Sequence, residues 1–185
     1  MRYLVASDIH GSETYCQKLL ERVEIEKPDT IVILGDILYH GPRNDLPLGY
    51  NPKKVIKLLN EYKDKILAVR GNCDAEVDQM VLEFPIMADY AIMEIGEHRY
   101  FATHGHIYNE EKLPPLKIGD ILLCGHTHIA VFNDHKTYYY VNPGSVSIPK
   151  AGEHSYILIE NDDIYFKDLD GNVFKKVSLK NKKWW

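Results

Sequence analysis

The sequence is organised around Asp8-Ile9-His10, which lies just beyond the apolar run Tyr3-Leu4-Val5-Ala6. An apolar run of this length predicts a buried strand. Asp8 and His10 are two positions apart, so in extended backbone their side chains point to the same side. A carboxylate and an imidazole at the end of one strand can hold a metal ion together. Such a pair is common by chance, and it gains significance here because the arrangement recurs along the chain.

The first half of the chain alternates predicted strands with predicted helices. The strands are expected at 3–6, 30–34 and 66–69, and the helices at 12–26, 52–62 and, in a short form, 77–81. This order favours a core of parallel strands. In the second half, short strands are expected at 91–95, 99–103, 120–124, 137–141, 155–160 and 163–169. Since no repeat or linker interrupts the pattern, one domain is predicted over residues 1–185.

Composition restricts the class of protein. The chain is 45% hydrophobic and carries a net charge of −5, which argues against an extended nucleic-acid surface. No apolar run approaches the roughly 20 residues of a membrane span, and strand-like sequence from residue 2 leaves no room for a secretory signal. Three widely spaced cysteines indicate a reducing compartment. The expected location is therefore the cytoplasm.

Polar side chains follow the predicted strands repeatedly. These candidate ligands are Asp8, His10, Asp36, Asn72, His104, His126 and His128. In open α/β sheets, ligands bind beyond the carboxyl ends of the strands. Seven ligands are too many for one metal with open positions, but they suit two ions that share a bridging carboxylate. Taken singly, each residue could equally be a strand-end polar group satisfied by its neighbours.

The ligand types indicate both the metals and the chemistry. Carboxylate, amide and imidazole groups together suit Mn²⁺, Fe²⁺, Zn²⁺ or Ni²⁺. Two such ions roughly 3.5–4 Å apart are a recurring device for phosphoryl and other hydrolytic chemistry, because they activate a bridging water and clamp the phosphoryl oxygens.

The motif series resembles that of the calcineurin-like metallophosphoesterase superfamily. The matching motifs, in order, are Asp8-Ile9-His10, Gly35-Asp36, Gly71-Asn72-Cys73-Asp74, His104-Gly105 and Gly125-His126-Thr127-His128. The stretches 35–44, 69–74 and 142–150 are similar to a subgroup, the small bacterial YfcE-type phosphodiesterases. The similarity extends over nearly the whole chain.

The resemblance implies a fold and a metal centre. The implied fold is an α/β four-layer αββα sandwich, with two mixed β-sheets flanked by helices. One divalent ion would be held by Asp8, His10, Asp36 and His128, and the other by Asp36, Asn72, His104 and His126. Asp36 would bridge the two ions, which we expect to be Mn²⁺, with Zn²⁺, Fe²⁺ or Ni²⁺ as alternatives.

The resemblance also implies an activity. It implies a metal-dependent phosphodiesterase in which a metal-bridging hydroxide attacks a small phosphodiester, with Asp36, Asn72 and His104 as catalytic groups. A homo-oligomer without membrane attachment is expected, with the long loop at 40–52 as its candidate interface. A phosphomonoesterase or a nuclease on the same site is the enzymatic alternative. A protein-interaction scaffold of the retromer-subunit type is the non-catalytic one.

The chain departs from the superfamily pattern at one position pair. Cys73 stands where most members have a histidine thought to protonate the leaving oxygen, and Tyr39 stands where its supporting aspartate would be. A thiol substitutes poorly for an imidazolium acid, so diesters with good leaving groups are the expected substrates. The residues expected to line the site or contact substrate are Cys73, Asp74, Arg43 and His106, with solvated or structural roles as alternatives for Arg43 and His106. Asp74 is also expected to support His10 or the loop geometry, or to cap the short helix.

Overall fold

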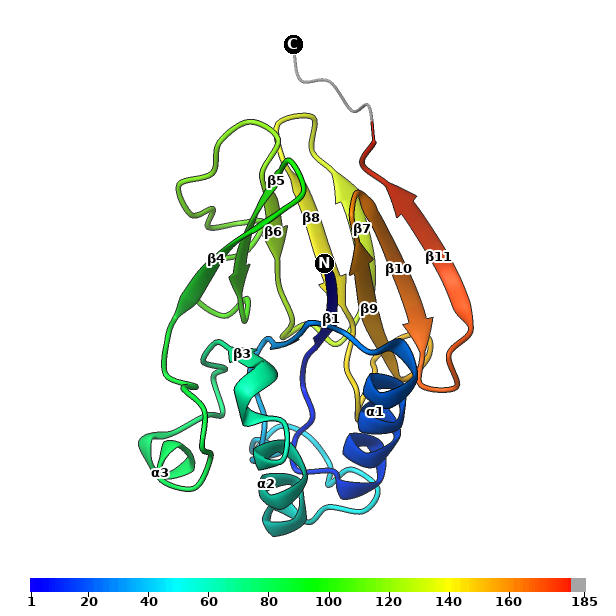
Figure 1. Ribbon diagram of the computed structural model, residues 1–185. Helices are drawn as coiled ribbons and strands as arrows, with labels where there is room; N and C mark the ends of the chain where they lie inside the picture. Colours follow the sequence, from blue (N-terminus) through cyan, green and yellow to red (C-terminus); the bar gives the residue numbers. More distant parts are fainter. Residues whose placement is uncertain (181–185) are drawn as a thin grey trace.

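The fold is a pair of mixed β-sheets in the computed structural model, which describes residues 1–180 (Figure 1). The larger, six-stranded sheet has the order β11-β10-β9-β1-β2-β3. Its parallel strands are β1 (Arg2–Ala6), β2 (Thr30–Ile33) and β3 (Ile66–Ala68). Its antiparallel strands are β9 (Ser155–Glu160), β10 (Asp163–Asp168) and β11 (Val173–Ser178).

The second, five-stranded sheet has the order β4-β5-β6-β8-β7. Its strands are β4 (Tyr90–Ile95), β5 (His98–Thr103), β6 (Ile121–Leu123), β7 (Ala130–Asp134) and β8 (Tyr139–Pro143). The central strands β5, β6 and β8 are parallel, and β4 and β7 pair antiparallel at the edges. Each sheet therefore contains three neighbouring parallel strands, which lie at one side of the larger sheet and at the centre of the smaller one.

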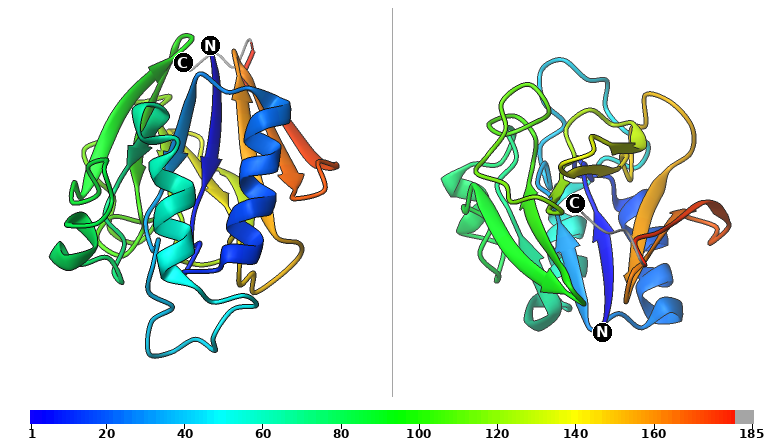
Figure 2. Two further views of the ribbon diagram at one scale, coloured as in Figure 1. Left: turned by 60° about the horizontal axis from the view of Figure 1, so that its bottom comes forward. Right: turned by 90° about the horizontal axis from the view of Figure 1, so that it is seen from above.

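Helices cover one outer face of this pair of sheets. Helices α1 (Glu13–Glu26) and α2 (Pro52–Asn60) lie side by side over the larger sheet (Figures 1 and 2). Along β1, Leu4 packs on the helix side, whereas Val5 packs between the sheets, as the strand period of two requires. On the far side of the second sheet, Tyr108 and Leu116 from the segment after β5 pack on its aromatic surface. The expected fold class, a sandwich of two mixed sheets, is confirmed.

Most local expectations are also confirmed. The Ser12 side chain caps α1 by accepting a hydrogen bond from the backbone N–H of Tyr15. The short α3 (Glu76–Gln79) exists, but its N-cap is Ala75 rather than Asp74. The prediction that Asp74 caps this helix is wrong, because its carboxylate accepts backbone N–H groups from the loops after β2 and β3.

Strands β7 and β11 were not expected from the sequence. β11 is an exposed edge strand containing two lysines, so it lacks the apolar alternation that identifies a half-buried strand. From the sequence, residues 180–185 are also predicted to form a mobile tail or an oligomer contact, and this prediction falls largely on residues 181–185, outside the described part of the chain. None of the helices within residues 1–180 is long and apolar enough to cross a membrane.

The carboxylate of the last residue of α1 anchors the helix to the larger sheet. Glu26, whose side chain is 10% exposed, accepts hydrogen bonds from the Tyr156 hydroxyl at 2.9 Å, from Arg22 and from the Lys167 ammonium. Burial on its own would raise the pKa of Glu26, but these three donors outweigh it and lower the pKa.

We expect Glu26→Gln to lower the free energy of unfolding at pH 7 by about 1–3 kcal/mol, because charge-assisted hydrogen bonds are lost. A folded-state pKa below the unfolded value adds stability that is complete above the unfolded pKa, about 4.3, and is lost as the pH falls through the folded pKa. Urea unfolding from pH 7 to pH 3 should therefore show the wild type and the variant converging at acid pH. The exposed Glu21→Gln is the matched control, and a constant difference across the pH range would contradict this account.

Candidate metal centre

The parallel strands of both sheets deliver all seven candidate ligands to one place. From the larger sheet, Asp8 and His10 follow β1, Asp36 follows β2 and Asn72 follows β3. From the smaller sheet, His104 follows β5, and His126 and His128 lie between β6 and β7. Backbone hydrogen bonds join these loops, from His10 N to Asp36 O at 2.9 Å and from Gly125 N to His104 O at 2.8 Å.

The backbone at these ligands is unusually strained. Five of the seven have a positive φ angle: Asp8 (58°), His10 (49°), Asp36 (53°), His126 (66°) and His128 (60°). A left-handed conformation costs a non-glycine residue roughly 1–2 kcal/mol. Strain of this kind persists only where the surrounding structure enforces it, and it clusters at functional sites. The conformation turns each side chain away from its strand and into the shared centre.

Two glycines make the close approach of these loops possible. A Cβ atom on Gly71 would lie 2.1 Å from Asp36 Oδ1, and one on Gly125 would lie 1.9 Å from the Ser7 hydroxyl. Since neither contact can be accommodated, only glycine fits at these positions. The glycine that precedes a ligand in these motifs is thus a packing requirement of the centre.

One group of ligands surrounds Asp8. Its Oδ1 atom lies 3.1 Å from His128 Nε2 and 3.5 Å from His10 Nε2, and the two imidazole nitrogens are 3.3 Å apart. Each ring has its other nitrogen at a backbone carbonyl: His10 Nδ1 at Tyr39 O (2.8 Å) and His128 Nδ1 at Ile148 O (2.9 Å). A carbonyl only accepts, so both rings hold their proton on Nδ1 and direct an Nε2 lone pair inward.

The second group surrounds His104. Its Nδ1 donates to Leu34 O at 2.6 Å, which directs its Nε2 lone pair toward Asn72 Oδ1 at 3.1 Å and His126 Nδ1 at 3.2 Å. Asp36 Oδ2 lies 3.5 Å from this Nε2 atom. The same oxygen lies 3.8 Å from His10 Nε2 in the first group, so Asp36 stands between the two groups.

These donor sets fit two divalent cations. Lone pairs of neighbouring imidazoles face one another, and the buried Asp8 Oδ1 has no hydrogen-bond partner among residues 1–180. Burial alone would lower the pKa of His104, but the hydrogen bond to Asp36 and the nearby carboxylates raise it to about 9. Burial and the neighbouring His104 lower the pKa of His126 to about 4, which keeps that ring neutral, as ligation requires. The carboxylates that raise the pKa of His104 would likewise attract a bound cation, and His126 presents a neutral ring to it.

Asp74 holds the loop that carries the bridging candidate. Its two carboxylate oxygens accept backbone N–H groups from Asp36 and Ile37, both at 2.9 Å, and from Gly71 at 2.7 Å. These contacts fix the geometry of the loops after β2 and β3. Asp74 was expected to support either His10 or the loop geometry, and these contacts match the role in loop geometry.

Cys73 and Tyr39 lie beside the metal ligands. Burial, together with the nearby Asp36 carboxylate, raises the pKa of the Cys73 thiol to about 12, so the group is protonated at neutral pH. Its Sγ atom lies 3.2 Å from Asn72 Nδ2. Tyr39 is 43% exposed and supplies the carbonyl that orients His10. Cys16 and Cys124 are fully buried in the core.

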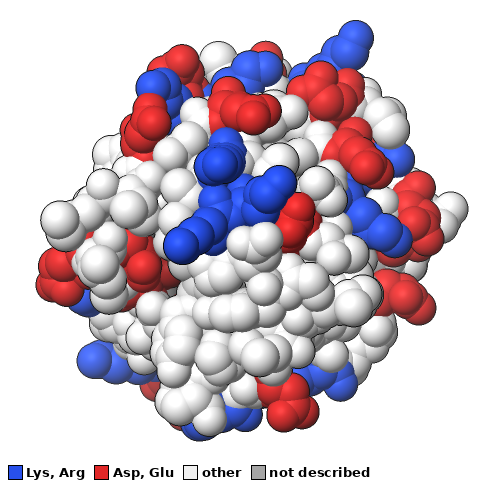
Figure 3. All heavy atoms as spheres, turned by 90° about the horizontal axis from the view of Figure 1, so that it is seen from below, with Lys and Arg blue, Asp and Glu red and all other residues white. Residues whose placement is uncertain are grey.

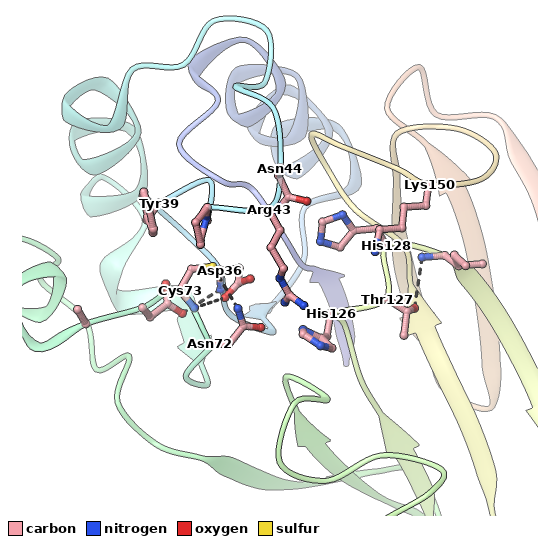
Figure 4. A pocket seen from close by; sticks show the side chains of 15 residues that line it. Asp36, Tyr39, Arg43, Asn44, Asn72, Cys73, His126, Thr127, His128 and Lys150 are labelled. Carbon is pink, nitrogen blue, oxygen red and sulfur yellow. Dashed lines mark hydrogen bonds between the residues drawn. The ribbon is translucent and has the colours of Figure 1, made fainter.

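A cavity of about 880 Å³ opens over the centre (Figure 4). Asp36, Asn72, His126 and His128 line it, as do Cys73, Asp74 and Tyr39. The expected contact Arg43 also lines it, and Figure 4 shows its guanidinium between Asn72 and His126. His106 packs its ring 5.3 Å from that of His104, measured between centroids, and does not belong to the cavity wall.

Sequence reasoning missed two residues, Lys150 and Asn142. Lys150 lines the cavity opposite Arg43. Asn142 is fully buried, and its Nδ2 atom lies 2.7 Å from Gly125 O and 3.0 Å from Thr127 Oγ1, while its Oδ1 accepts from Gly144 N at 2.9 Å. The turn signal Asn142-Pro143-Gly144-Ser145 was visible, but its contacts, about 15 residues away in sequence, were not.

We expect Asn142→Ala to weaken metal binding about 10–100-fold, because the loop that carries His126 and His128 loses its anchor. Unpaired buried groups should also lower the free energy of unfolding by about 1–3 kcal/mol. Calorimetric titration of metal-stripped protein with Mn²⁺ measures the first effect, and urea unfolding measures the second. Asn133→Ala on β7, which loses a surface contact to Glu110, is the matched control. Unchanged metal affinity in Asn142→Ala would remove the anchoring role.

Residues 1–163 match the family described as the calcineurin-like phosphoesterase superfamily domain. This chain belongs to that superfamily. The resemblance drawn from the motif series is therefore confirmed.

Relatives within and around the superfamily agree with this assignment. The chain is 49% identical to Phosphodiesterase YfcE of Escherichia coli (strain K12), over 97% of this chain and 98% of the relative. The solved structure of YfcE, a phosphoesterase from E. coli, matches with a TM-score of 0.94 at 46% identity, covering 97% of this chain and 100% of the other. Vacuolar Protein Sorting 29 from Cryptosporidium parvum matches with a TM-score of 0.61 at 17% identity, covering 96% and 97% of the two chains, a likeness of fold alone.

Proposed function

We propose that this superfamily member is a phosphodiesterase that depends on two divalent metal ions. The observation that carries the proposal is the pair of ligand groups, in which imidazole lone pairs face one another and Asp36 Oδ2 lies between the groups. The name of the E. coli relative supports the same reaction class. When bound, the two cations would supply a hydroxide nucleophile near neutral pH and neutralise the phosphoryl oxygens.

The residues of the chain would hold the two ions and position the substrate phosphate. Asp8, His10 and His128 would hold one ion, and Asn72, His104 and His126 the other, with Asp36 shared. The hydrogen bond from Cys73 N to Asp36 Oδ1 at 2.8 Å fixes the carboxylate and leaves Oδ2 facing the imidazoles. Asn72 and His104 would keep the substrate phosphate in line over the centre. Arg43 would bind a non-bridging oxygen of the phosphate from above.

A diester suits this cavity better than a monoester. Cys73 stands in the position of the superfamily acid, and its thiol is protonated. Tyr39, which replaces the supporting aspartate, offers it no carboxylate partner. Without a strong proton donor at this position, leaving groups that depart as anions unaided are favoured. Figure 3 shows a group of Lys and Arg side chains near the centre of the face seen from below. The cations that line the cavity, Arg43 and Lys150, would attract an anionic substrate despite the net charge of −5.

Mn²⁺ is the metal we propose, since oxygen, amide and imidazole ligands suit it. The cytoplasm is the proposed compartment. A homo-oligomer is proposed through the loop at 40–52, where Leu46 and Leu48 are 61% and 65% exposed. The scaffold alternative predicts a centre without turnover, so activity decides between the two functions.

The test is hydrolysis of p-nitrophenyl phosphate and bis(p-nitrophenyl) phosphate by metal-stripped protein, with and without added Mn²⁺. The proposal expects turnover of the diester that requires Mn²⁺ and exceeds turnover of the monoester. Preferred hydrolysis of the monoester would favour the phosphomonoesterase alternative. No turnover with Mn²⁺, Zn²⁺, Fe²⁺ or Ni²⁺ would favour the scaffold.

A further inference from the structure

Two cationic side chains in the cavity wall have no partner of opposite charge. Arg43 and Lys150 are both exposed and both line the cavity. Within residues 1–180, neither forms an ion pair with a carboxylate. Some basic residues on the surface are paired, for example Arg2 with Glu160 at 2.7 Å and Arg70 with Asp89 at 2.5 Å, and others, such as Lys65, are not paired within the described part of the chain. What distinguishes Arg43 and Lys150 is their position in the cavity wall. Two unpaired cations beside a phosphate site leave charge for a ligand to neutralise.

Hydrogen bonds place the segments that carry both cations beside the centre. Lys150 N donates to His128 O at 3.0 Å, and a bridge joins Ile129 to Ala151, so the lysine is held beside a metal-ligand candidate. On the other side, Asn44 Nδ2 donates to His40 O at 2.8 Å and closes the turn that carries Arg43. Figure 4 shows the two side chains entering the cavity from opposite loops.

The two positions differ in what they can reach. Arg43 lies over Asn72 and His126, where the scissile phosphate would sit, and its forked donors suit a phosphate in a fixed orientation (Figure 4). Lys150 enters near His128 at the side of the cavity. A lysine is a point charge that binds phosphate without demanding one orientation. It can therefore serve a group carried by the substrate away from the reacting phosphorus.

We propose that the substrate is a phosphodiester that carries a second phosphate on one of its ester groups, with Lys150 binding that second phosphate. This inference rests on the proposed function, because it assigns the reacting phosphate to the metal centre. A cavity of about 880 Å³ falls within the range of roughly 300–1,000 Å³ typical of small-ligand sites and accommodates a ligand of nucleotide size. A terminal phosphate carries a charge of about −1.5 to −2 at neutral pH, which a second cation in the wall would partly neutralise.

The test compares two ligands that differ only in the second phosphate: thymidine 5′-phosphate and thymidine 3′,5′-bisphosphate. Isothermal titration calorimetry in the presence of Mn²⁺ measures the Kd of each for the wild type, Lys150→Ala and Lys150→Arg. We expect the bisphosphate to bind the wild type about tenfold more tightly, the value of one charge-assisted hydrogen bond. This advantage should fall to about twofold or less in Lys150→Ala and return in Lys150→Arg.

The controls separate this inference from its alternatives. Lys65→Ala removes an exposed lysine outside the cavity and should retain the full advantage. Arg43→Ala should weaken both ligands alike and leave their ratio near the wild-type value. Equal Kd values for the two ligands in the wild type, or an advantage that persists in Lys150→Ala, would overturn the inference.

The same preparations should be assayed with bis(p-nitrophenyl) phosphate. If that diester is hydrolysed while calorimetry shows no preference for the bisphosphate, the second-phosphate inference fails and the proposed function stands. If it is not hydrolysed but the Lys150-dependent preference appears, the proposed function fails and the phosphate site remains.

Discussion

Asp36→Asn should reduce Mn²⁺-dependent hydrolysis of bis(p-nitrophenyl) phosphate at least about 10³-fold, the scale expected when a central electrostatic group is lost. Asp36 Oδ2 is the carboxylate oxygen that lies within 3.8 Å of both ligand groups. An amide oxygen could still accept the hydrogen bond from Cys73 N, so the loop should keep its shape. What is lost is the negative charge that the two ions would share.

Metal analysis distinguishes this cause from misfolding. We expect the variant to retain fewer than two metal ions per chain after dialysis against Mn²⁺, with an unfolding temperature close to that of the metal-stripped wild type. Asp45→Asn is the matched control. Asp45 is an exposed aspartate that precedes α2 in the sequence, as Asp36 does, and it lies outside the cavity wall. Wild-type activity in Asp36→Asn would exclude Asp36 as a bridging ligand.

The second large effect concerns the leaving group. Across a series of aryl diesters, we expect kcat to fall about 10²–10⁴-fold as the pKa of the leaving phenol rises from about 7 to 10. This is the contribution that a positioned general acid would otherwise make. The reason is that Cys73, a thiol with its pKa raised to about 12, occupies the position of the superfamily acid. Poor leaving groups therefore receive no proton from this position.

The Cys73→Ser variant provides the control for this series. If the thiol takes no part in proton transfer, the dependence of kcat on leaving-group pKa should have the same slope in the variant as in the wild type. A flat dependence in the wild type would mean that another group protonates the leaving oxygen. A slope that steepens in Cys73→Ser would identify the thiol as that donor.

The ligand motifs could be found from the sequence because each consists of an apolar run and a polar residue that closely follows it. An apolar run followed by Asp8 or by Asp36 predicts a strand and the polar group at its end, and the structure places both beyond parallel strands. The two mixed sheets were implied by the resemblance to the superfamily, and the change of pattern between the chain halves was consistent with them. That all the ligands meet could be expected from the shared edge of parallel strands.

Other features depend on contacts that local pattern does not encode. Asn142 contacts Gly125 and Thr127 across about 15 residues, and Lys150 reaches the cavity through backbone pairing with the loop of His128. The left-handed backbone at the ligands is imposed by the neighbouring loops and has no signature in residue type. Strand β11 is a polar edge strand without an apolar pattern of its own, and it forms by pairing with β10.

The central claim is that the seven ligands form one centre for two ions that acts on phosphodiesters. The most direct test titrates metal-stripped protein with Mn²⁺ while recording both the heat of binding and the hydrolysis of bis(p-nitrophenyl) phosphate. The account predicts binding of two equivalents per chain, with activity completed by the second. Saturation at one equivalent, or diester hydrolysis that is complete before Mn²⁺ is added, would contradict it.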